Sequence, residues 1–127
     1  MPKVLIVTGD AAEDLEVFYP YQRLLEEGYE VDIAAPSVKR LQFVVHDFVD
    51  GFDTYTEKLG HTWQADLAFA DVDPADYVAL VVPGGRAPEY LRNDEFGQFG
   101  TSLTISQWVS IGTVSYTHLT LPTILLV

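Results

Sequence analysis

Two runs of apolar residues organise the first part of the chain. Residues 3–8 read KVLIVT and residues 78–82 read VALVV, and each run ends at a glycine turn, Gly9-Asp10 after the first and Pro83-Gly84-Gly85 after the second. Short apolar runs rich in Val and Ile, closed by such turns, are typical of strands buried on both faces of a sheet. The pattern therefore predicts two central strands, each followed by a loop at its carboxyl end.

Helical spacing follows the first predicted strand. Residues 12–27 predict a helix that ends at Gly28, and Pro20 is expected to kink it or to make its first turns irregular. Residues 30–36, EVDIAAP, alternate and predict another strand. A strand, a helix and a strand in this order predict a right-handed crossover and a parallel sheet. The apolar residues expected to share one face of the helix are Leu15, Phe18, Tyr19, Leu24 and Leu25.

Polar and aromatic residues alternate in the stretch between the strands predicted at residues 30–36 and 78–82. Residues 41–48 and 52–58 are expected to form short strands in an excursion from the sheet edge, and residues 65–69 a further short strand. A helical turn is expected to begin at Asp73-Pro74. We expect these elements to belong to one α/β domain without repeats or linkers.

Composition narrows the class of protein. The chain has 127 residues, 48% of them apolar, and a formal net charge of -12. Such a charge repels nucleic acids and anionic membranes, so we expect neither as a partner and consider a small metabolite more plausible. No apolar run approaches the roughly 20 residues of a membrane span, and the start of the chain is too short for a signal-peptide core. With no cysteine, disulfides and thiolate metal sites are excluded, which fits a cytoplasmic protein.

The last part of the chain has a different composition. All 7 basic and 19 acidic residues lie between Lys3 and Glu95, and residues 96–127 have none. That segment cannot supply the amphipathic helices that cover an α/β sheet. Residues 119–127 could form a buried strand, although Pro122 would interrupt a central one. Residues 114–123, VSYTHLTLPT, resemble the translation of a transposase adaptor used for sequencing libraries. We therefore expect residues 1–95 to be the domain and residues 96–127 an anomalous, non-native tail.

The candidate site residues are expected at one edge of the predicted sheet. In a doubly wound sheet the loops after residues 3–8 and 78–82 open on the same edge, which brings Glu13 towards Gly84 and Gly85. Two glycines leave backbone N–H groups accessible to an oxyanion or a phosphate. The alternatives are that Glu13 only complements the positive end of the helix dipole and that the glycine pair only makes a turn.

Two segments carry a family resemblance. Residues 3–36 together with residues 76–94, in particular Glu-Asp-x-Glu from Glu13 and PGGRAPE from Pro83, resemble the ThiJ/PfpI family of intracellular proteases, deglycases and glyoxalase III enzymes. Residues 51–61 resemble its longer, glyoxalase III-like or plant-type members. The resemblance implies a flavodoxin-like α/β fold, a parallel sheet sandwiched by helices, that is truncated here after the PGGR loop.

The resemblance also implies a mechanism. In that family a cysteine at a strand-to-helix elbow is the nucleophile, the carboxylate matching Glu13 hydrogen-bonds its sulfur, and amides matching Gly84 and Gly85 face the oxyanion. Arg86 would lie on the substrate side or pair with a nearby acid. These enzymes need no cofactor and no metal, act on small reactive carbonyl compounds or as hydrolases and peptidases, and are commonly homo-oligomers.

This chain departs from the family at the nucleophile. It contains no cysteine, and Ser115 is a poor substitute because Tyr116 and no glycine elbow follow it. We therefore expect an inactive fragment of a carbonyl-handling enzyme. The alternative is a non-catalytic α/β module that binds a small molecule or anion and whose tail is genuine. A phosphoacceptor receiver domain is disfavoured because Pro83-Gly84 occupies the place of its aspartate.

The remaining polar residues give weaker signals. His46 and His61 lack the spacing of a metal site, so we expect no metal. His61 with Trp63 could line a substrate pocket, but surface packing is the simpler interpretation, as it is for Tyr55 and Glu57. Residues 8–14, TGDAAED, lack the Gly-x-Gly-x-x-Gly pattern of dinucleotide binding.

Overall fold

The computed structural model of the chain describes residues 2–88 and 123–126. The predictions for most of the tail, residues 96–122, lie outside the described residues, and so does Ser115. In the described ranges no helix is long and apolar enough to cross a membrane.

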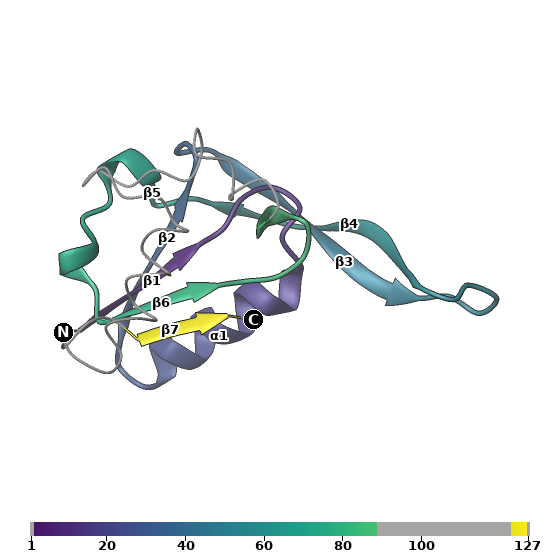
Figure 1. Cartoon of the computed structure of the whole chain (residues 1–127), viewed down its shortest axis with the longest axis horizontal. Coiled ribbons are helices and arrows are strands. Elements are labelled where there is room, and N and C mark those ends of the chain that lie inside the picture. The colour runs from purple at the N-terminus through teal and green to yellow at the C-terminus, as the bar shows by residue number, and fades with distance from the viewer. Residues whose placement is uncertain (1, 89–122, 127) are drawn as a thin grey trace.

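A five-stranded parallel sheet forms the body of the protein (Figure 1). The strand order is β5-β2-β1-β6-β7, and every pairing is parallel. The α/β class and the parallel sheet predicted from the apolar runs are confirmed. The strands are β1 (Lys3–Val7), β2 (Glu30–Ala35), β5 (Leu67–Ala68), β6 (Ala79–Val82) and β7 (Thr123–Leu126).

Strand β7 comes from the segment that lacks charged residues. It pairs with β6 over four residues, from Ala79 with Thr123 to Val82 with Leu126. Pro122 lies in the sequence directly before the first residue of this strand. A strand was one of the two interpretations of residues 119–127, and the described residues 123–126 form one.

Helix α1 (Asp14–Glu26) crosses from β1 to β2 and continues through Pro20. Val17 is fully buried, and Phe18, Tyr21 and Leu24 pack against the same core. These positions recur every three to four residues and form the true apolar stripe. The predicted face was partly wrong, because Leu15 and Tyr19 are 71% and 68% exposed and Leu25 is also exposed.

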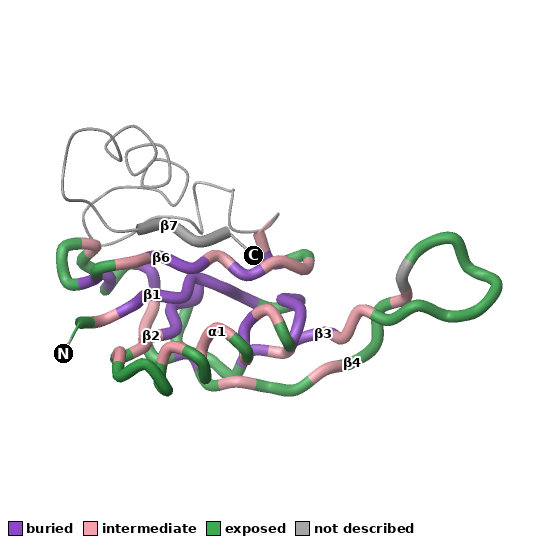
Figure 2. Tube along the Cα trace, turned by 90° about the horizontal axis from the view of Figure 1, so that it is seen from below, coloured by how far each residue is buried: buried purple, intermediate pink, exposed green. Residues whose placement is uncertain are grey.

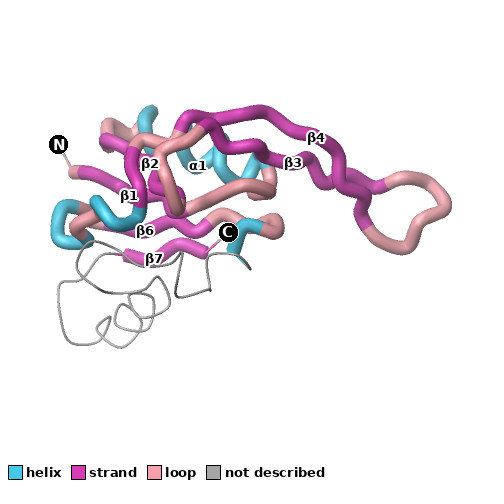
Figure 3. The backbone as a smooth tube through the Cα atoms, turned by 90° about the horizontal axis from the view of Figure 1, so that it is seen from above, coloured by secondary structure: helices cyan, strands magenta, loops and turns pink. Residues whose placement is uncertain are grey.

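A long β-hairpin forms a second, two-stranded sheet. It comprises β3 (Arg40–Phe48) and β4 (Tyr55–Gln64), with a register shift between Gln42 and Val44. The strand predicted at 41–48 is confirmed, whereas the one predicted at 52–58 begins later, at Tyr55, and continues to Gln64. The predicted strand at 65–69 is reduced to β5 and a 3-10 turn, η1 (Phe69–Asp71). The expected turn at Asp73-Pro74 is present as η2 (Pro74–Asp76). The hairpin extends well beyond the body (Figure 3).

Both faces of the sheet are covered. Val4 and Ile6 of β1 face the cluster that contains α1 and the hairpin residue Phe43, whereas Leu5 and Val7 face the other cluster. This alternation is the period of a strand. Figure 2 shows the buried residues gathered in the sheet and in the adjoining part of β3, and the exposed far end of the hairpin beyond them. On the second face the Tyr77 hydroxyl donates to Asp32 at 2.7 Å, and burial, followed by this carboxylate, raises the pKa of Tyr77.

Thr8 is a fully buried residue whose hydroxyl has no hydrogen-bond partner in the described part of the chain. Replacing Thr8 with Val exchanges the hydroxyl for a methyl group of similar shape. We expect Thr8→Val to be neutral or to raise the free energy of unfolding by about 1 kcal/mol, because an unsatisfied polar group is removed from the core. Urea unfolding measures the change.

Thr62→Val is the control, because the Thr62 hydroxyl is exposed and accepts a hydrogen bond from Arg40 Nε at 2.9 Å. No gain in stability is expected there. A clear loss of stability in Thr8→Val would show that the Thr8 hydroxyl is satisfied in solution.

Candidate functional site

The loop after β1 meets the loop after β6 at the carboxyl edge of the sheet. The Glu13 amide donates to the Gly84 carbonyl at 3.3 Å, and the Arg86 amide donates to the Ala11 carbonyl at 2.9 Å. Together they make a short antiparallel bridge centred on Ala12 and Gly85. The neighbourhood of Glu13 and the glycine pair, inferred from topology, is thus present in the structure.

Gly85 permits this close approach. Its φ is +90°, and a Cβ built at this position would lie 2.5 Å from the Glu13 nitrogen and 2.8 Å from the Ala11 oxygen. A side chain would therefore meet backbone atoms that have little room to move. The two loops can lie together in this way because residue 85 is glycine.

The bridge does not use the backbone N–H groups of Gly84 and Gly85. The bridge uses the Gly84 carbonyl and the Arg86 amide. Among the described residues, none accepts a hydrogen bond from the amide of Gly84 or of Gly85. Backbone amides in a glycine turn are donors of the kind that stabilise an oxyanion.

Glu13 is buried and is the N-cap of α1. Its Oε2 accepts a hydrogen bond from the Glu16 amide at 3.1 Å. The capping role that the sequence left open is therefore present. Its Oε1 accepts no hydrogen bond from any residue that the structure describes, which leaves an acceptor for a further group. A capped helix start holds this carboxyl in one place, as a catalytic acid requires.

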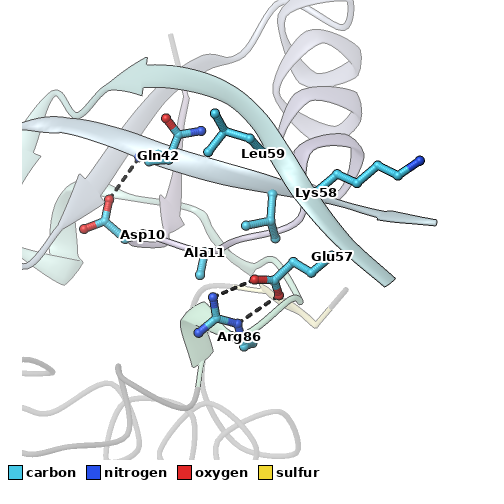
Figure 4. A pocket seen from close by; sticks show the side chains of 8 residues that line it. Asp10, Ala11, Gln42, Glu57, Lys58, Leu59 and Arg86 are labelled. Carbon is cyan, nitrogen blue, oxygen red and sulfur yellow. Dashed lines mark hydrogen bonds and ion pairs between the residues drawn. The ribbon is translucent and has the colours of Figure 1, made fainter. Parts of the chain in front are cut away.

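Strand β3 supports the loop that carries Glu13. The Ala11 amide donates to the Gln42 carbonyl and the Val44 amide to the Ala12 carbonyl, both at 2.9 Å. Ala11 has a φ of +67°, a strained value for a residue with a Cβ. The backbone N–H of Gln42 also donates to Oδ1 of Asp10 at 2.9 Å (Figure 4). Burial opposes ionisation of Asp10, but the hydrogen bonds from Lys39 and Gln42 overcome it and lower its pKa.

Arg86 pairs with Glu57 of β4. Its Nε and Nη2 donate to the two Glu57 oxygens at 2.9 and 2.6 Å (Figure 4). The Arg86 hydrogen bond, followed by that of His46 against an opposing burial effect, lowers the pKa of Glu57. A pocket of about 330 Å³ lies beside this pair and is also lined by Asp10, Ala11 and Gln42. Sequence reasoning assigned Glu57 to packing and did not single out Asp10 or Gln42, because their partners come from other segments.

We expect the Arg86–Glu57 pair to make stability depend on pH in acid. The folded state lowers the pKa of Glu57, so its contribution is present above the ordinary Glu pKa of about 4.3 and is lost as pH falls through the lower folded value. Glu57→Gln should flatten the fall of the thermal midpoint between about pH 5 and 3. An unchanged pH profile in this variant would contradict the assignment.

His61 lies apart from this pocket. Its ring is largely exposed, and its Nδ1 lies 2.7 Å from Oδ2 of Asp14, a buried carboxylate that also accepts from the His61 amide. The ring packs on Phe18, as does that of Trp63. A Cβ at Gly60 would lie 2.5 Å from Asp14 Oδ1, so a side chain at position 60 would require the Asp14 carboxylate to move. No cluster of three or more potential metal ligands occurs in residues 2–88 and 123–126.

Comparison with known proteins places this geometry in a family. A family model described as DJ-1/PfpI matches residues 2–111, a range that extends past Glu95. The chain is 45% identical over 96 residues to protein DJ-1 homolog D of Arabidopsis thaliana, which covers 73% of this chain and 24% of that protein. It is 46% identical over 93 residues to a deglycase of Pyrococcus abyssi, and the match covers 73% of this chain and 48% of that protein. The chain thus spans about half the length of this archaeal relative.

Solved structures show the same fold. A two-domain protein of Anabaena variabilis with DJ-1/ThiJ/PfpI-like and ferritin-like domains aligns with a TM-score of 0.58 and 25% identity, over 80% of this chain and 26% of that one. A ThiJ/PfpI domain protein of Brachyspira murdochii aligns with a TM-score of 0.58 and 17% identity, over 91% of this chain and 52% of that one. The sheet described above is therefore a flavodoxin-like sheet of the ThiJ/PfpI kind.

Proposed function

The chain belongs to the DJ-1/PfpI family, and from this premise we propose that it carries the acid and the oxyanion amides of a cysteine-dependent, cofactor-free active site for reactive carbonyl compounds. The reaction class is that of a glyoxalase or deglycase. The observation that carries the proposal is the contact of Glu13 with Gly84 at the sheet edge. The names of the archaeal relatives support it, since they are deglycases.

The proposed chemistry assigns a role to each group. A cysteine thiolate adds to the carbonyl carbon of the substrate, and the electron pair of the C=O bond moves to its oxygen. The amides of Gly84 and Gly85 stabilise that oxyanion, and the carboxyl of Glu13 hydrogen-bonds the sulfur and holds a proton near it. Arg86 orients the loop through Glu57. Because thiolate nucleophiles persist in reducing compartments, the same proposal places the protein in the cytoplasm.

The 127-residue chain contains no cysteine and is proposed to be inactive by itself. We expect no loss of methylglyoxal above the rate of a Glu13→Ala variant, because the nucleophile is missing. A discontinuous assay of methylglyoxal over time measures this. Turnover by the chain above that control would show that another residue acts as the nucleophile.

A completed domain tests the function itself. Residues 1–95 would be joined to the remaining segment of the Pyrococcus abyssi deglycase, which the proposal requires to contain the nucleophilic cysteine. We expect methylglyoxal turnover that falls about 100-fold or more in Glu13→Gln, the range typical of an acid–base group. Glu16→Gln is the matched control in the same helical turn and should retain activity. Cleavage of a fluorogenic peptide, with no methylglyoxal turnover, would instead assign the hydrolase or peptidase branch.

A non-catalytic binding module is the second candidate. The pairing of β7 with β6 favours it, because a genuine tail would contribute a strand to the sheet. Limited proteolysis separates the two proposals. Protection of residues 96–127 would support the module, whereas rapid trimming near Glu95 would support a domain that ends there and a non-native tail.

A further inference from the structure

The outer part of the β3–β4 hairpin, residues 46–58, is an arm that extends away from the sheet and helix (Figures 1 and 3). Among the described residues, its two strands pair only with each other. The root of the arm is held to the body by the Glu57–Arg86 pair and by the backbone hydrogen bond from Val44 to Ala12. The arm therefore presents its tip, residues 48–53, to the surroundings from a fixed base.

The tip exposes apolar side chains. Phe48 is 78% exposed and Phe52 is 65% exposed, and Val49 between them is exposed as well. They belong to one turn, in which the Phe52 amide donates to the Val49 carbonyl at 3.1 Å. Single exposed apolar residues are ordinary on a protein surface, but two phenylalanines in one projecting turn mark a contact surface.

The same turn carries carboxylates that have no cation. Asp50 and Asp53 are exposed, and neither forms an ion pair with any residue in the described part of the chain. The other two acids of the arm are already paired, Asp47 with Lys58 at 3.1 Å and Glu57 with Arg86 at 2.6 Å. The tip thus combines phenylalanine side chains with two carboxylates that are open to a positive charge.

We propose that this tip docks a basic segment of another protein, one that combines Lys or Arg with apolar residues. A guanidinium or ammonium group gains twice at such a surface, because it pairs with a carboxylate and lies over the face of a phenylalanine ring. The apolar residues of the segment cover the remaining surface of Phe48, Val49 and Phe52. An acidic or a purely polar segment gains neither contact.

This chain cannot supply the basic segment itself. Of its 7 basic residues, Arg40 donates to Thr62, Arg92 lies outside the described residues, and the others pair with acids of the same chain. Residues 96–127 contain no charged side chain. A second copy would also bring a net charge of -12, which repels an acidic tip. The occupant is therefore a different protein. The basic residues paired within the chain are Lys3, Arg23, Lys39, Lys58 and Arg86.

The size of the tip fits a short segment. Two phenylalanine side chains that become buried remove roughly 300–500 Å² from water. A stable interface between folded domains needs about 800 Å² on each partner. The tip offers less than this, so we expect weak and reversible binding of a peptide-like segment whose affinity depends strongly on charge.

Fluorescence anisotropy of a labelled short peptide composed of Arg and Leu, titrated with the full chain, tests the proposal at about 0.05 M and 0.5 M NaCl. We expect saturable binding that weakens about tenfold or more at the higher salt, because the contact is between opposite charges. A peptide with Ser in place of Leu should bind about tenfold more weakly. A peptide with Glu in place of Arg should not bind. The readout does not depend on any enzymatic activity of the chain.

Two double variants locate the contact. Phe48→Ser/Phe52→Ser and Asp50→Asn/Asp53→Asn should each lower the affinity for the Arg and Leu peptide about tenfold or more. Their circular dichroism should stay unchanged, because all four side chains are exposed.

Matched control variants separate the tip from the rest of the acidic surface. Leu15→Ser/Tyr19→Ser removes two equally exposed apolar residues from α1. Asp71→Asn/Asp76→Asn removes two exposed negative charges beside η1 and η2, the same change in net charge as in the tip variant. Both controls should leave the affinity unchanged.

Four results would overturn the proposal. Absence of binding at low salt excludes a basic segment as the occupant. Equal weakening by the tip variants and their controls shows attraction to the acidic chain as a whole. Affinity that is the same at both salt concentrations excludes charge as its basis. A dimer in sedimentation velocity that Phe48→Ser/Phe52→Ser dissociates would make a second copy the occupant.

Discussion

Replacing Gly85 with alanine is expected to be among the most damaging single substitutions in the described chain. The positive φ costs about 1–2 kcal/mol for a residue with a Cβ. The new Cβ would also lie 2.5 Å from the Glu13 nitrogen, so the loops after β1 and β6 must separate. We expect the free energy of unfolding to fall by more than the φ cost alone, as measured by urea unfolding.

Gly51→Ala is the matched control for this prediction. Gly51 also has a positive φ, +92°, but a Cβ there would meet nothing within 4 Å. The difference between the two variants therefore isolates the approach of the glycine loop to Glu13. Equal losses in the two variants would show that the loops do not lie together in solution, and the proposed site would lose its geometry.

Truncating Phe43 to alanine is expected to destabilise the protein by about 3–5 kcal/mol, the range for a buried aromatic residue. Phe43 is fully buried, and its ring lies 5.7 Å from that of Phe18 on α1. It therefore joins the hairpin to the helix and the sheet. Phe48→Ala on the same strand should change stability by less than about 0.5 kcal/mol, because Phe48 is exposed.

The Phe43 variant should also loosen the loop after β1, which carries Glu13. Gln42 and Val44 flank Phe43 and bond to Ala11 and Ala12, so a shift of β3 releases both hydrogen bonds. Hydrogen exchange at the Ala11 and Val44 amides is expected to accelerate in Phe43→Ala and not in Phe48→Ala. Unchanged exchange at these amides would show that β3 does not hold the loop.

Local patterns were sufficient to predict the central strands of the sheet. The apolar runs at residues 3–8 and 78–82 correspond to β1 and β6, because a strand buried on both faces needs apolar residues at every position. The helix was located correctly, but its buried face was assigned incorrectly. Leu15 and Tyr19 are spaced like core residues, and only the position of the sheet and hairpin shows that Val17 and Tyr21 face inwards.

The ion pairs around the site were not predictable. Arg86 and Glu57 are 29 positions apart, and His61 and Asp14 are 47 apart. No spacing rule relates residues at such separations, because the contacts depend on how the hairpin folds back over the loop after β1. The family resemblance left Arg86 either on the substrate side or paired with a nearby acid, and the fold pairs it with Glu57.

The sequence by itself determined the parallel α/β sheet, the family to which the chain belongs, and the absence of a cysteine to act on a carbonyl. It also placed Glu13 and the glycine pair at one edge, because the carboxyl ends of parallel strands always meet there. Tertiary structure alone decided the contact distance of the two loops, the partners of Arg86 and His61, and the projection of the β3–β4 hairpin. Those features arise where segments distant in sequence pack together, and packing depends on shapes that no single segment contains.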